Sequence, residues 1–459
     1  MRQPGAILLL SCYELGHQPL NLASPLAFLG HAGYAPAAID TSVQPLPDEA
    51  ITAAQLVAIS VPMHTALRLG VAVAERVRAA NPTAHLCFYG MYATLNADYL
   101  LDDPADSVIG GEYEAPLLAL ARALDEGAPL RVEGVGTRHR PAAAVRARTP
   151  FRVPDRSTLP PLAAYAGLEH DGALTLGGYA EATHGCLHTC LHCPLTPVYG
   201  GRLFVVPADV VLADIRAQVA MGAGHITFGD PDFLNGPGHA LKILRAMRDE
   251  FPHLTFDATI KIEHILERRA LFPELRSLGC QFVLSAVESV SDEVLRRLDK
   301  GHARRDVVEA VQITRAAGIA LRPSLLPFTP WETFASYVEL LDFFEEHQML
   351  DQVDPVQYTI RLLVPPGSAL AADLARDGLL GPLDAAAYSY AWQHPDARMD
   401  RLQREVAALV EAGERSGEHP VDTFYRIKER ACALLGRAAT ARSYVAGAAP
   451  PRLTESWFC

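Results

Sequence analysis

The chain has 459 residues, of which 49 % are hydrophobic and 20 % are charged, a composition that excludes a disordered protein. Its length predicts two or three packed domains, and its net charge of −13 argues against DNA as a partner, because nucleic-acid backbones attract basic surfaces. Eight cysteines are too few for a disulfide scaffold at this length, and they are unevenly placed along the chain.

The first 130 residues alternate short apolar segments with amphipathic ones. We expect strands at 6–10, 37–39, 56–61, 85–89 and 107–109, and helices at 22–31, 66–80 and 115–124. This rhythm predicts a doubly wound parallel sheet with helices on both faces, which binds ligands at the carboxyl ends of its strands. No apolar run is long enough to span a bilayer, so we expect a cytoplasmic protein without membrane contact.

A second α/β series is expected to follow a linker at 131–172, a segment rich in glycine, proline and arginine. Over 173–366 the expected strands are a lead-in strand near 176 and others at 225–228, 254–259, 281–286, 319–325 and 355–362. Helices are expected between them at 207–220, 239–250, 263–278, 304–317 and 331–347. These repeats predict a partial (β/α)6 barrel with its chemistry at the carboxyl ends of the strands. A helical C-terminal region at 367–449 and a separate tail at 450–459 complete the expected organisation.

Three of the cysteines lie close together: Cys186, Cys190 and Cys193, in the spacing C-x3-C-x2-C. Three thiolates on a short loop can hold three irons of a [4Fe–4S] cube and leave the fourth iron open for a small ligand. Zinc is the alternative metal, because histidines alternate with these cysteines, namely His184, His188 and His192. The sequence has no second C-x-x-C knuckle of the kind that completes most structural zinc sites. A zinc-stabilised binding protein without catalysis stays open as a competing function.

The cysteine loop follows the first strand of the second series, and here the chain resembles a radical S-adenosylmethionine (SAM) enzyme over about residues 175–365. The resemblance implies a [4Fe–4S] cluster on the three cysteines, SAM on the open iron, and a one-electron cleavage that releases a 5′-deoxyadenosyl radical. The family usually has an aromatic residue before the third cysteine, where this chain has His192. A small-molecule or peptide substrate and a reductant such as flavodoxin or ferredoxin are implied with it.

Several other positions match stretches of this family. Gly229 and Asp230 open the segment Gly-Asp-Pro-Asp-Phe after a strand, where the family receives the SAM amino group; a plain turn is the alternative. Ser285 and Glu288, in Ser-Ala-Val-Glu-Ser, stand ahead of 292–301, which ends in Lys-Gly. Together these stretches are similar to a Val-Glu-Ser…Leu…Lys-Gly signature, and the resemblance implies that Ser285 and Glu288 contact the ribose and methionine parts of SAM.

Two cationic residues also belong to strands of the second series or follow them. Arg322 is implied as a partner of the SAM carboxylate, because a planar guanidinium fits a carboxylate in two places at once. Lys261 follows the strand at 254–259, and we expect it to be a surface lysine at the start of a helix.

The N-terminal sheet resembles the cobalamin-binding module that precedes many radical SAM domains. The matching pieces lie at strand ends or in the loops after them, at 19–28, 57–62, 88–90 and 109–113. The Asp-x-His-x-x-Gly motif that supplies a lower axial histidine is absent, so a bound cobalamin would lack that ligand. The resemblance implies methyl transfer to an unactivated carbon or another radical rearrangement. The alternative is a radical SAM enzyme whose N-terminal domain kept the fold, lost the cofactor and binds substrate.

The chain ends in Ser-Trp-Phe-Cys459, a segment that two prolines detach from the preceding helices. Together with 192–202 and 229–236, this tail resembles a radical SAM group whose members end in Cys-Cys-Ala-Glu-Pro or Cys-selenocysteine-Ala-Glu-Pro. The resemblance implies a redox role for Cys459 in the active site, paired with a selenocysteine encoded by a UGA codon directly after it. An ordinary stop codon there, without Ala-Glu-Pro codons beyond it, would contradict this selenoprotein hypothesis. A frayed terminus with an incidental cysteine is the alternative.

Overall fold

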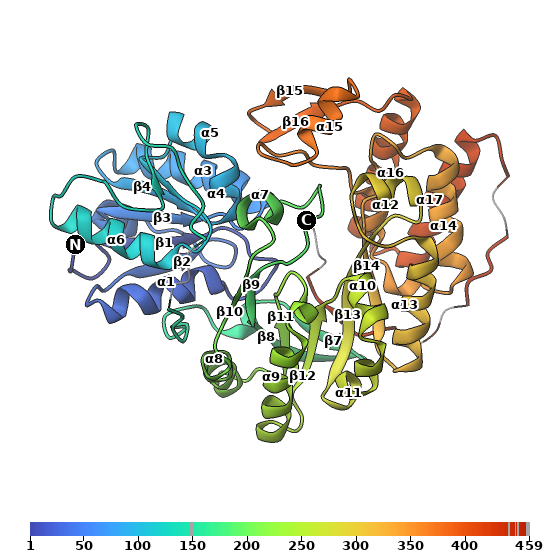
Figure 1. The fold of residues 1–459 in the computed structure, drawn as a ribbon, viewed down its shortest axis with the longest axis horizontal. Helices are drawn as coiled ribbons and strands as arrows, with labels where there is room; N and C mark the ends of the chain where they lie inside the picture. The colour runs from blue at the N-terminus through green and yellow to red at the C-terminus, as the bar shows by residue number, and fades with distance from the viewer. Residues whose placement is uncertain (147–149, 439–440, 446, 448, 456–459) are drawn as a thin grey trace.

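The computed structural model describes residues 1–146, 150–438, 441–445, 447 and 449–455. Two helix-covered sheets lie side by side, one from the blue and teal part of the chain and the other from the green to orange part (Figure 1). We call them the N-terminal unit and the barrel unit. Among the described residues, no helix is long and apolar enough to cross a membrane.

The sheet of the N-terminal unit has the strand order β2-β1-β3-β4-β5-β6. Its strands are β1 (Ile7–Ser11), β2 (Ala37–Asp40), β3 (Leu56–Ser60), β4 (His85–Tyr89), β5 (Ser107–Ile109) and β6 (Val135–Gly136). The strands β1 to β5 are parallel, as the sequence predicts, and β6 pairs antiparallel with β5. The helices around them are α1 (Leu20–His31), α2 (Asp48–Ala53), α3 (His64–Ala80), α4 (Met91–Leu95), α5 (Ala97–Asp102) and α6 (Glu114–Asp125).

The central strands of this sheet are buried on both faces, which explains their continuous apolar sequence. Leu8 and Leu10 belong to the core on one face of the sheet, whereas Ile7 and Leu9 belong to the core on the other. The strand order places β1 beside β3 at the point where the winding of the sheet reverses. Doubly wound sheets bind ligands at the carboxyl ends of the strands at such a point.

The sheet of the barrel unit has the order β14-β13-β12-β11-β8-β7-β17. Its strands are β7 (Gly167–His170), β8 (Ala173–Ala180), β11 (His225–Phe228), β12 (Thr255–Thr259), β13 (Cys280–Glu288), β14 (Ala320–Leu325) and β17 (Arg452–Leu453). The strands from β8 to β14 are parallel, β7 is antiparallel to β8, and β17 is antiparallel to β7. The sheet curls so far that Leu453 of β17 and Phe282 of β13 belong to one buried cluster.

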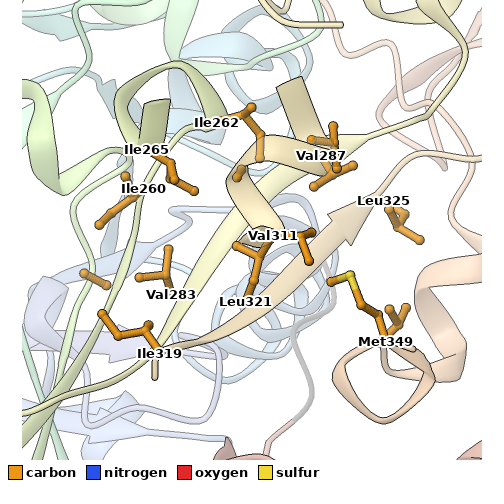
Figure 2. Close-up of a cluster of buried hydrophobic side chains, with 14 of the residues drawn as sticks. Ile260, Ile262, Ile265, Val283, Val287, Val311, Ile319, Leu321, Leu325 and Met349 are labelled. Carbon is orange, nitrogen blue, oxygen red and sulfur yellow. The ribbon is translucent and has the colours of Figure 1, made fainter. Parts of the chain in front are cut away.

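The outside of the curled sheet is covered by α8 (Ala208–Ala220), α9 (Pro237–Glu250), α10 (Ile262–Glu267), α11 (Phe272–Ser277), α13 (Arg304–Ala316) and α14 (Phe334–Glu346). Helix α12 (Asp292–Arg297) instead belongs, through Val294, to a cluster with Trp392 of the C-terminal region. The largest core lies between these helices and the sheet; Figure 2 shows Val283 and Leu321 of the strands beside Val311 of α13. The C-terminal region contains α15 (Ala371–Arg376), α16 (Ala397–Ser416) and α17 (Pro420–Leu434), and also the hairpin β15 (Leu380–Asp384)–β16 (Ser389–Trp392).

Two elements of the barrel unit differ from the sequence prediction. The helix expected over 263–278 is divided into α10, a short 3-10 turn and α11, because Pro273 offers no N–H to continue the helical bonding. The sixth strand expected over 355–362 is a 3-10 helix, η5 (Pro355–Thr359), followed by a single parallel bridge between Phe328 and Arg361.

Side chains replace the sixth strand along the edge of β14. The side-chain oxygens of Gln352 and Gln357 accept hydrogen bonds from the backbone N–H groups of Leu321 (3.3 Å) and Leu325 (2.9 Å). Pro323, between these two positions, has no N–H to satisfy. The outer edge of β14 is therefore bonded without a neighbouring strand, which also protects it from pairing with another chain.

A buried arginine of the linker joins the two units. Arg156 donates to the carboxylate of Asp214 on α8 through Nε (2.6 Å) and Nη2 (2.9 Å). It also donates to Oε1 of Gln18 (2.9 Å), in the N-terminal unit, and to the carbonyl of Tyr179 (2.8 Å). Only 2 % of the Arg156 side chain and 4 % of the Asp214 side chain are exposed. One guanidinium therefore fixes atoms of both units against each other.

Candidate active site

The three clustered cysteines follow β9 (Thr183–Gly185), which pairs antiparallel with β10 (Leu203–Val205) just beyond the carboxyl end of β8. Gly185 has a φ of +75°, and a Cβ atom there would lie 2.4 Å from the carbonyl oxygen of Arg202. Only glycine therefore lets the chain turn into the loop at this point. The loop ends at α7 (Leu195–Tyr199), which starts directly after Cys193 and Pro194.

Cys186, Cys190 and Cys193 are free thiols. The pKa of Cys193 is raised to about 12, chiefly by burial; charge on Cys190 or Cys186 adds to this rise, whereas a backbone hydrogen bond at Leu195 and the charge of Lys300 oppose it. These mutual effects place the three sulfur atoms within electrostatic reach of one another. Burial also raises the pKa of Cys186, whose Sγ accepts a hydrogen bond from Asn235 at 3.4 Å. Thiols kept neutral by burial lose their protons when a metal cation binds, so the group has the chemistry of a metal site.

Each histidine of this loop contacts a carboxylate that comes from a different segment. The pairs are His184 with Glu112 (3.0 Å), His188 with Asp232 (3.1 Å) and His192 with Glu288 (3.2 Å). The second ring nitrogen of His184 faces Glu181, and that of His188 faces Lys261. A zinc ion would have to displace a partner before His184 or His188 could bind it, so the arrangement disfavours zinc on these two rings. The buried Nδ1 of His192 has no hydrogen-bond partner among the described residues.

The strand before the cysteine loop is tied to the loop after β11 through Asp230. This buried carboxylate accepts hydrogen bonds from the hydroxyl of Thr183 (2.6 Å) and from the N–H of Ala182 (2.9 Å), and burial raises its pKa to about 7. Gly229 packs against Tyr179 so closely that a Cβ atom would lie 1.8 Å from the phenol oxygen. The structure thus brings Gly229 and Asp230 to the cysteine loop, and their contact with SAM stays a prediction.

Glu288 ends β13 in the left-handed conformation, with a φ of +63°, where the β13–β14 register shifts. Few residues other than glycine adopt this conformation, so the surrounding contacts must hold Glu288 in it. Glu288 accepts a hydrogen bond from the ammonium of Lys300 (3.2 Å) and faces His192. Burial would raise the pKa of Glu288, but the charge of Lys300 and the hydrogen bond from His192 outweigh it and hold the pKa at about 2. Glu288 is therefore ionised beside the cysteine loop.

Ser285 lies three residues before the carboxyl end of β13, and Arg322 lies three residues before that of β14. Ser285 is two residues from Val283 and two from Val287, which pack against the helices, so its side chain lies on the same face as theirs. Arg322 donates through Nη2 to Asp354 at 2.7 Å, and its buried Nη1 has no hydrogen-bond partner among the described residues. Within the described part of the chain, no hydrogen bond or ion pair joins either residue to the cysteine loop. Their roles toward SAM stay predictions.

Lys261 is not the surface residue that the sequence predicts, because only 8 % of it is exposed. Its ammonium lies 3.2 Å from Nδ1 of His188 and pairs with Glu263, and these partners offset the cost of burying a charge. His188, Asp232 and His264 bring three metal-binding atoms within 4.8 Å of one another. The ammonium beside His188 already supplies a cation to this group, and we assign no metal to it.

Sequence reasoning gave no role to three residues around the loop: Glu112, Asp232 and Lys300. All three stand in segments that carry the resemblances above, Asp232 in Gly-Asp-Pro-Asp-Phe, Glu112 in Ile-Gly-Gly-Glu-Tyr and Lys300 in the Lys-Gly that ends 292–301. Carboxylates inside glycine-rich loops at strand ends were the available signal. Nothing in the sequence says that their partners are the histidines of the cysteine loop.

The tail adds β17 to the barrel sheet beside β7. Thr454 and Gly167 exchange two hydrogen bonds, from the N–H of Thr454 to the carbonyl (2.9 Å) and from the N–H of Gly167 to the Thr454 hydroxyl (3.1 Å). Glu455 accepts a hydrogen bond from the phenol of Tyr13, in the N-terminal unit, at 2.9 Å. Because β17 is antiparallel to β7, it runs in the same direction as β8, which leads to the cysteine loop. Cys459, the predicted redox residue, lies outside the described residues.

The carboxyl edge of the N-terminal sheet carries buried polar atoms without a hydrogen-bond partner among the described residues. They belong to Ser11, Asp40 and Ser60, at the ends of β1, β2 and β3, and to Glu14 in the loop after β1. Burial raises the pKa of Glu14 to about 8 and also raises that of Asp40. Buried polar atoms of this kind usually mark the position of ordered water or of a ligand.

Comparison with known proteins bears on this site. Residues 181–344 match the model of the Radical SAM superfamily. Ribosomal protein uS12 methylthiotransferase RimO of Chloroherpeton thalassium is 27 % identical over 186 residues, which are 37 % of this chain and 41 % of that protein. An uncharacterized methyltransferase of Pyrococcus horikoshii is 23 % identical over 300 residues, 64 % of each chain. This chain thus spans about two fifths of the length of the first relative and two thirds of the second.

Solved structures share the fold over both units. The cobalamin-dependent S-adenosylmethionine radical enzyme OxsB, with aqua-cobalamin and S-adenosylmethionine bound, superposes with a TM-score of 0.71 at 14 % identity, over 90 % of this chain and 67 % of OxsB. The radical S-adenosylmethionine methyltransferase TsrM of Kitasatospora setae, with cobalamin and a [4Fe–4S] cluster bound, gives 0.64 at 17 % identity, over 84 % and 81 %. These likenesses confirm the predicted fold class.

Proposed function

We propose that this chain, whose residues 181–344 match the Radical SAM superfamily model, binds a [4Fe–4S] cluster on Cys186, Cys190 and Cys193 and uses it to cleave SAM reductively. The observation that carries the proposal is the loop itself, with three free thiols in the spacing C-x3-C-x2-C beside a curled parallel sheet. The donor set fits the group, because three thiolates can hold three irons, while both ring nitrogens of His184 and His188 already have partners. When bound, the cluster supplies one electron to the sulfonium of SAM.

The residues around the loop support this role by holding it and by balancing its charge. Asn235 donates to the sulfur of Cys186, and Asp230 fastens the strand that leads into the loop. The buried ammonium of Lys300 lowers the pKa of Cys193 against the effect of burial, so it favours the thiolate form of that residue.

For SAM itself we propose the predicted residues Gly229, Asp230, Ser285, Glu288 and Arg322. Ser285 would act through its backbone, because its side chain lies on the helix-facing side of β13. Glu288 has the strongest support, because it is ionised and contacts the cysteine loop. Arg322 has a buried Nη1 without a hydrogen-bond partner among the described residues, which suits a carboxylate.

We further propose that the N-terminal unit binds cobalamin, and that the reaction is a methyl transfer or another radical rearrangement. Two observations support this: the shared fold with OxsB and TsrM, whose structures contain cobalamin, and the buried polar atoms of Ser11, Asp40 and Ser60. A rim of unpaired hydroxyl and carboxyl oxygens fits the amide-rich periphery of a corrinoid. The second candidate is a radical SAM enzyme without cobalamin, in which the same edge binds the substrate.

The tail is proposed to bring Cys459 to the active site as a redox thiol. The direction of β17 and the contact of Glu455 with Tyr13 support this, because they lead the chain to the junction of the two units. A small-molecule or peptide substrate, a flavodoxin- or ferredoxin-like reductant and a cytoplasmic location complete the proposal.

Anaerobic purification tests the cluster. We expect a brown protein that contains iron and sulfide and gives the electron paramagnetic resonance (EPR) signal of a reduced cluster. Cys186→Ala, Cys190→Ala and Cys193→Ala should each lose most of the iron. Cys280→Ala, a change in the core of β13, should keep it. A colourless protein with one zinc ion per chain would overturn the proposal.

Product analysis then separates the two enzyme hypotheses. With SAM, a reductant and added cobalamin, we expect 5′-deoxyadenosine, and S-adenosylhomocysteine besides it if a methyl group is transferred. If cobalamin neither binds the protein nor changes the products, the N-terminal unit serves the substrate instead.

A further inference from the structure

We infer that Glu112, a residue of the N-terminal unit, is a positioning residue for the cysteine loop, because its carboxylate holds both ends of that loop at once. The inference deepens the proposed function and rests on it wherever a cluster is measured. It implies that the conformation of the cysteine loop depends on the contact with the N-terminal unit.

The geometry joins one carboxylate to the entrance and the exit of the loop. At the entrance, Nδ1 of His184, two residues before Cys186, lies 3.0 Å from Oε2 of Glu112. At the exit, the phenol of Tyr199, six residues after Cys193, donates to Oε1 of Glu112 at 3.2 Å. Glu112 is only 1 % exposed, so water cannot replace these partners. Hydrogen bonds to a buried carboxylate are among the stronger ones in proteins.

Two glycines explain why Glu112 reaches across to the barrel unit. A Cβ atom on Gly110 would lie 1.6 Å from the hydroxyl oxygen of Thr94, and one on Gly111, whose φ is +70°, would lie 2.2 Å from the carbonyl of Val145. The loop after β5 therefore lies in close contact with Thr94 and Val145, which leaves no room for side chains at the two glycines. The N–H of Glu112 donates to the same carbonyl of Val145 at 3.1 Å. Backbone contacts thus fix the position from which the carboxylate acts.

The linker holds the exit of the loop through the next residue along the chain. Arg146, adjacent to Val145, donates to the carbonyls of Val198 (2.6 Å) and Pro197 (2.7 Å) on α7. Helix α7 also lies beside α4 of the N-terminal unit (Figure 1). The contacts at α7 would hold the exit alone, whereas Glu112 connects the exit to the entrance.

The test compares amide hydrogen exchange in the whole chain without cluster for wild type and four variants. Glu112→Gln keeps the size of the side chain and removes its charge, and we expect exchange over residues 183–200 to become about tenfold faster. Glu112→Asp keeps the charge and should recover part of the protection. Tyr199→Phe removes one arm only and should accelerate exchange at 195–200 more than at 183–185.

Glu114→Gln is the matched control. Glu114 is also buried, but its Oε1 accepts from Ser24 inside the N-terminal unit. Burial raises its pKa, and the charge of Glu112 acts in the same direction. We expect exchange over 183–200 to stay at the wild-type rate in this variant.

Several results would overturn the inference: wild-type exchange in Glu112→Gln, equal acceleration in Glu114→Gln, or acceleration spread over the whole N-terminal unit, as in a folding defect. If Glu112→Gln does not fold, Tyr199→Phe decides: an equal acceleration of exchange at 183–185 and at 195–200 would also overturn the inference.

A second readout uses the loaded protein. Reconstituted Glu112→Gln should hold several-fold less iron, and the iron that it keeps should give an altered EPR signal, while Glu112→Asp moves back toward wild type. If the wild-type chain binds no cluster, the proposed function fails, and the exchange experiment still decides whether Glu112 holds the loop.

Discussion

The buried pair of Arg156 and Asp214 allows a prediction of stability that follows directly from its contacts. In Asp214→Asn the side chain keeps its shape but loses its charge, and an amide can accept only one of the two hydrogen bonds that the carboxylate accepts from Arg156. The guanidinium of Arg156 is then left buried without a counterion. Breaking a buried pair in this way costs about 3–5 kcal/mol, and we expect the lower end, because Gln18 and Tyr179 still accept from Arg156.

The assay is urea unfolding followed by circular dichroism and by tryptophan fluorescence. The first transition is the one to compare, because two units need not unfold in one step. The control is Glu250→Gln, which breaks the exposed pair of Glu250 with Arg216 on the same helix, α8. Exposed pairs contribute about 1 kcal/mol or less. If Asp214→Asn costs no more than Glu250→Gln, the reasoning that burial makes this pair decisive is wrong.

Three further predictions concern the site and the tail. The pKa of Glu288 is about 2 in the fold against 4.5 for an ordinary glutamate, so its ionised form contributes about 3 kcal/mol of stability above pH 4.5. This contribution is lost as the pH falls toward 2, so the urea midpoints of wild type and Glu288→Gln should converge over that range. A difference between the midpoints that stays constant would contradict this. Leu453→Ala should weaken the attachment of the tail by about 2 kcal/mol and speed its proteolysis, unlike Val445→Ala, at a residue that is 78 % exposed. Gly229→Ala should cost about 1–3 kcal/mol of stability by thermal unfolding, and less in a Tyr179→Leu background, because the phenol is what the new Cβ meets; an equal cost in both backgrounds would refute the clash.

The parallel strands of both units are predictable because burial on two faces leaves a local mark, a short run of apolar residues between turns. The segment 355–362 shows where this mark misleads. It is apolar enough to read as a strand, but it forms a 3-10 helix, and its Gln357, together with Gln352, accepts hydrogen bonds from backbone N–H groups at the edge of β14. A hydrogen bond from a backbone N–H to the side chain of a distant residue leaves no periodic signal, so a sequence pattern cannot tell an edge that is closed in this way from one that takes another strand.

In the candidate site, too, residues that are close in sequence are predictable, and partners that are distant in sequence are not. The three cysteines are predictable as one ligand set because they lie within eight residues, where local geometry alone brings them together. The partners of the alternating histidines come from 72, 44 and 96 residues away, at Glu112, Asp232 and Glu288. On the sequence alone, a histidine beside a cysteine is as good a zinc ligand as it is a hydrogen-bond donor. For His184 and His188 the fold decides between the two by placing a partner against both nitrogens of each ring, so that these histidines hold the loop in place while the thiols stay free for a metal.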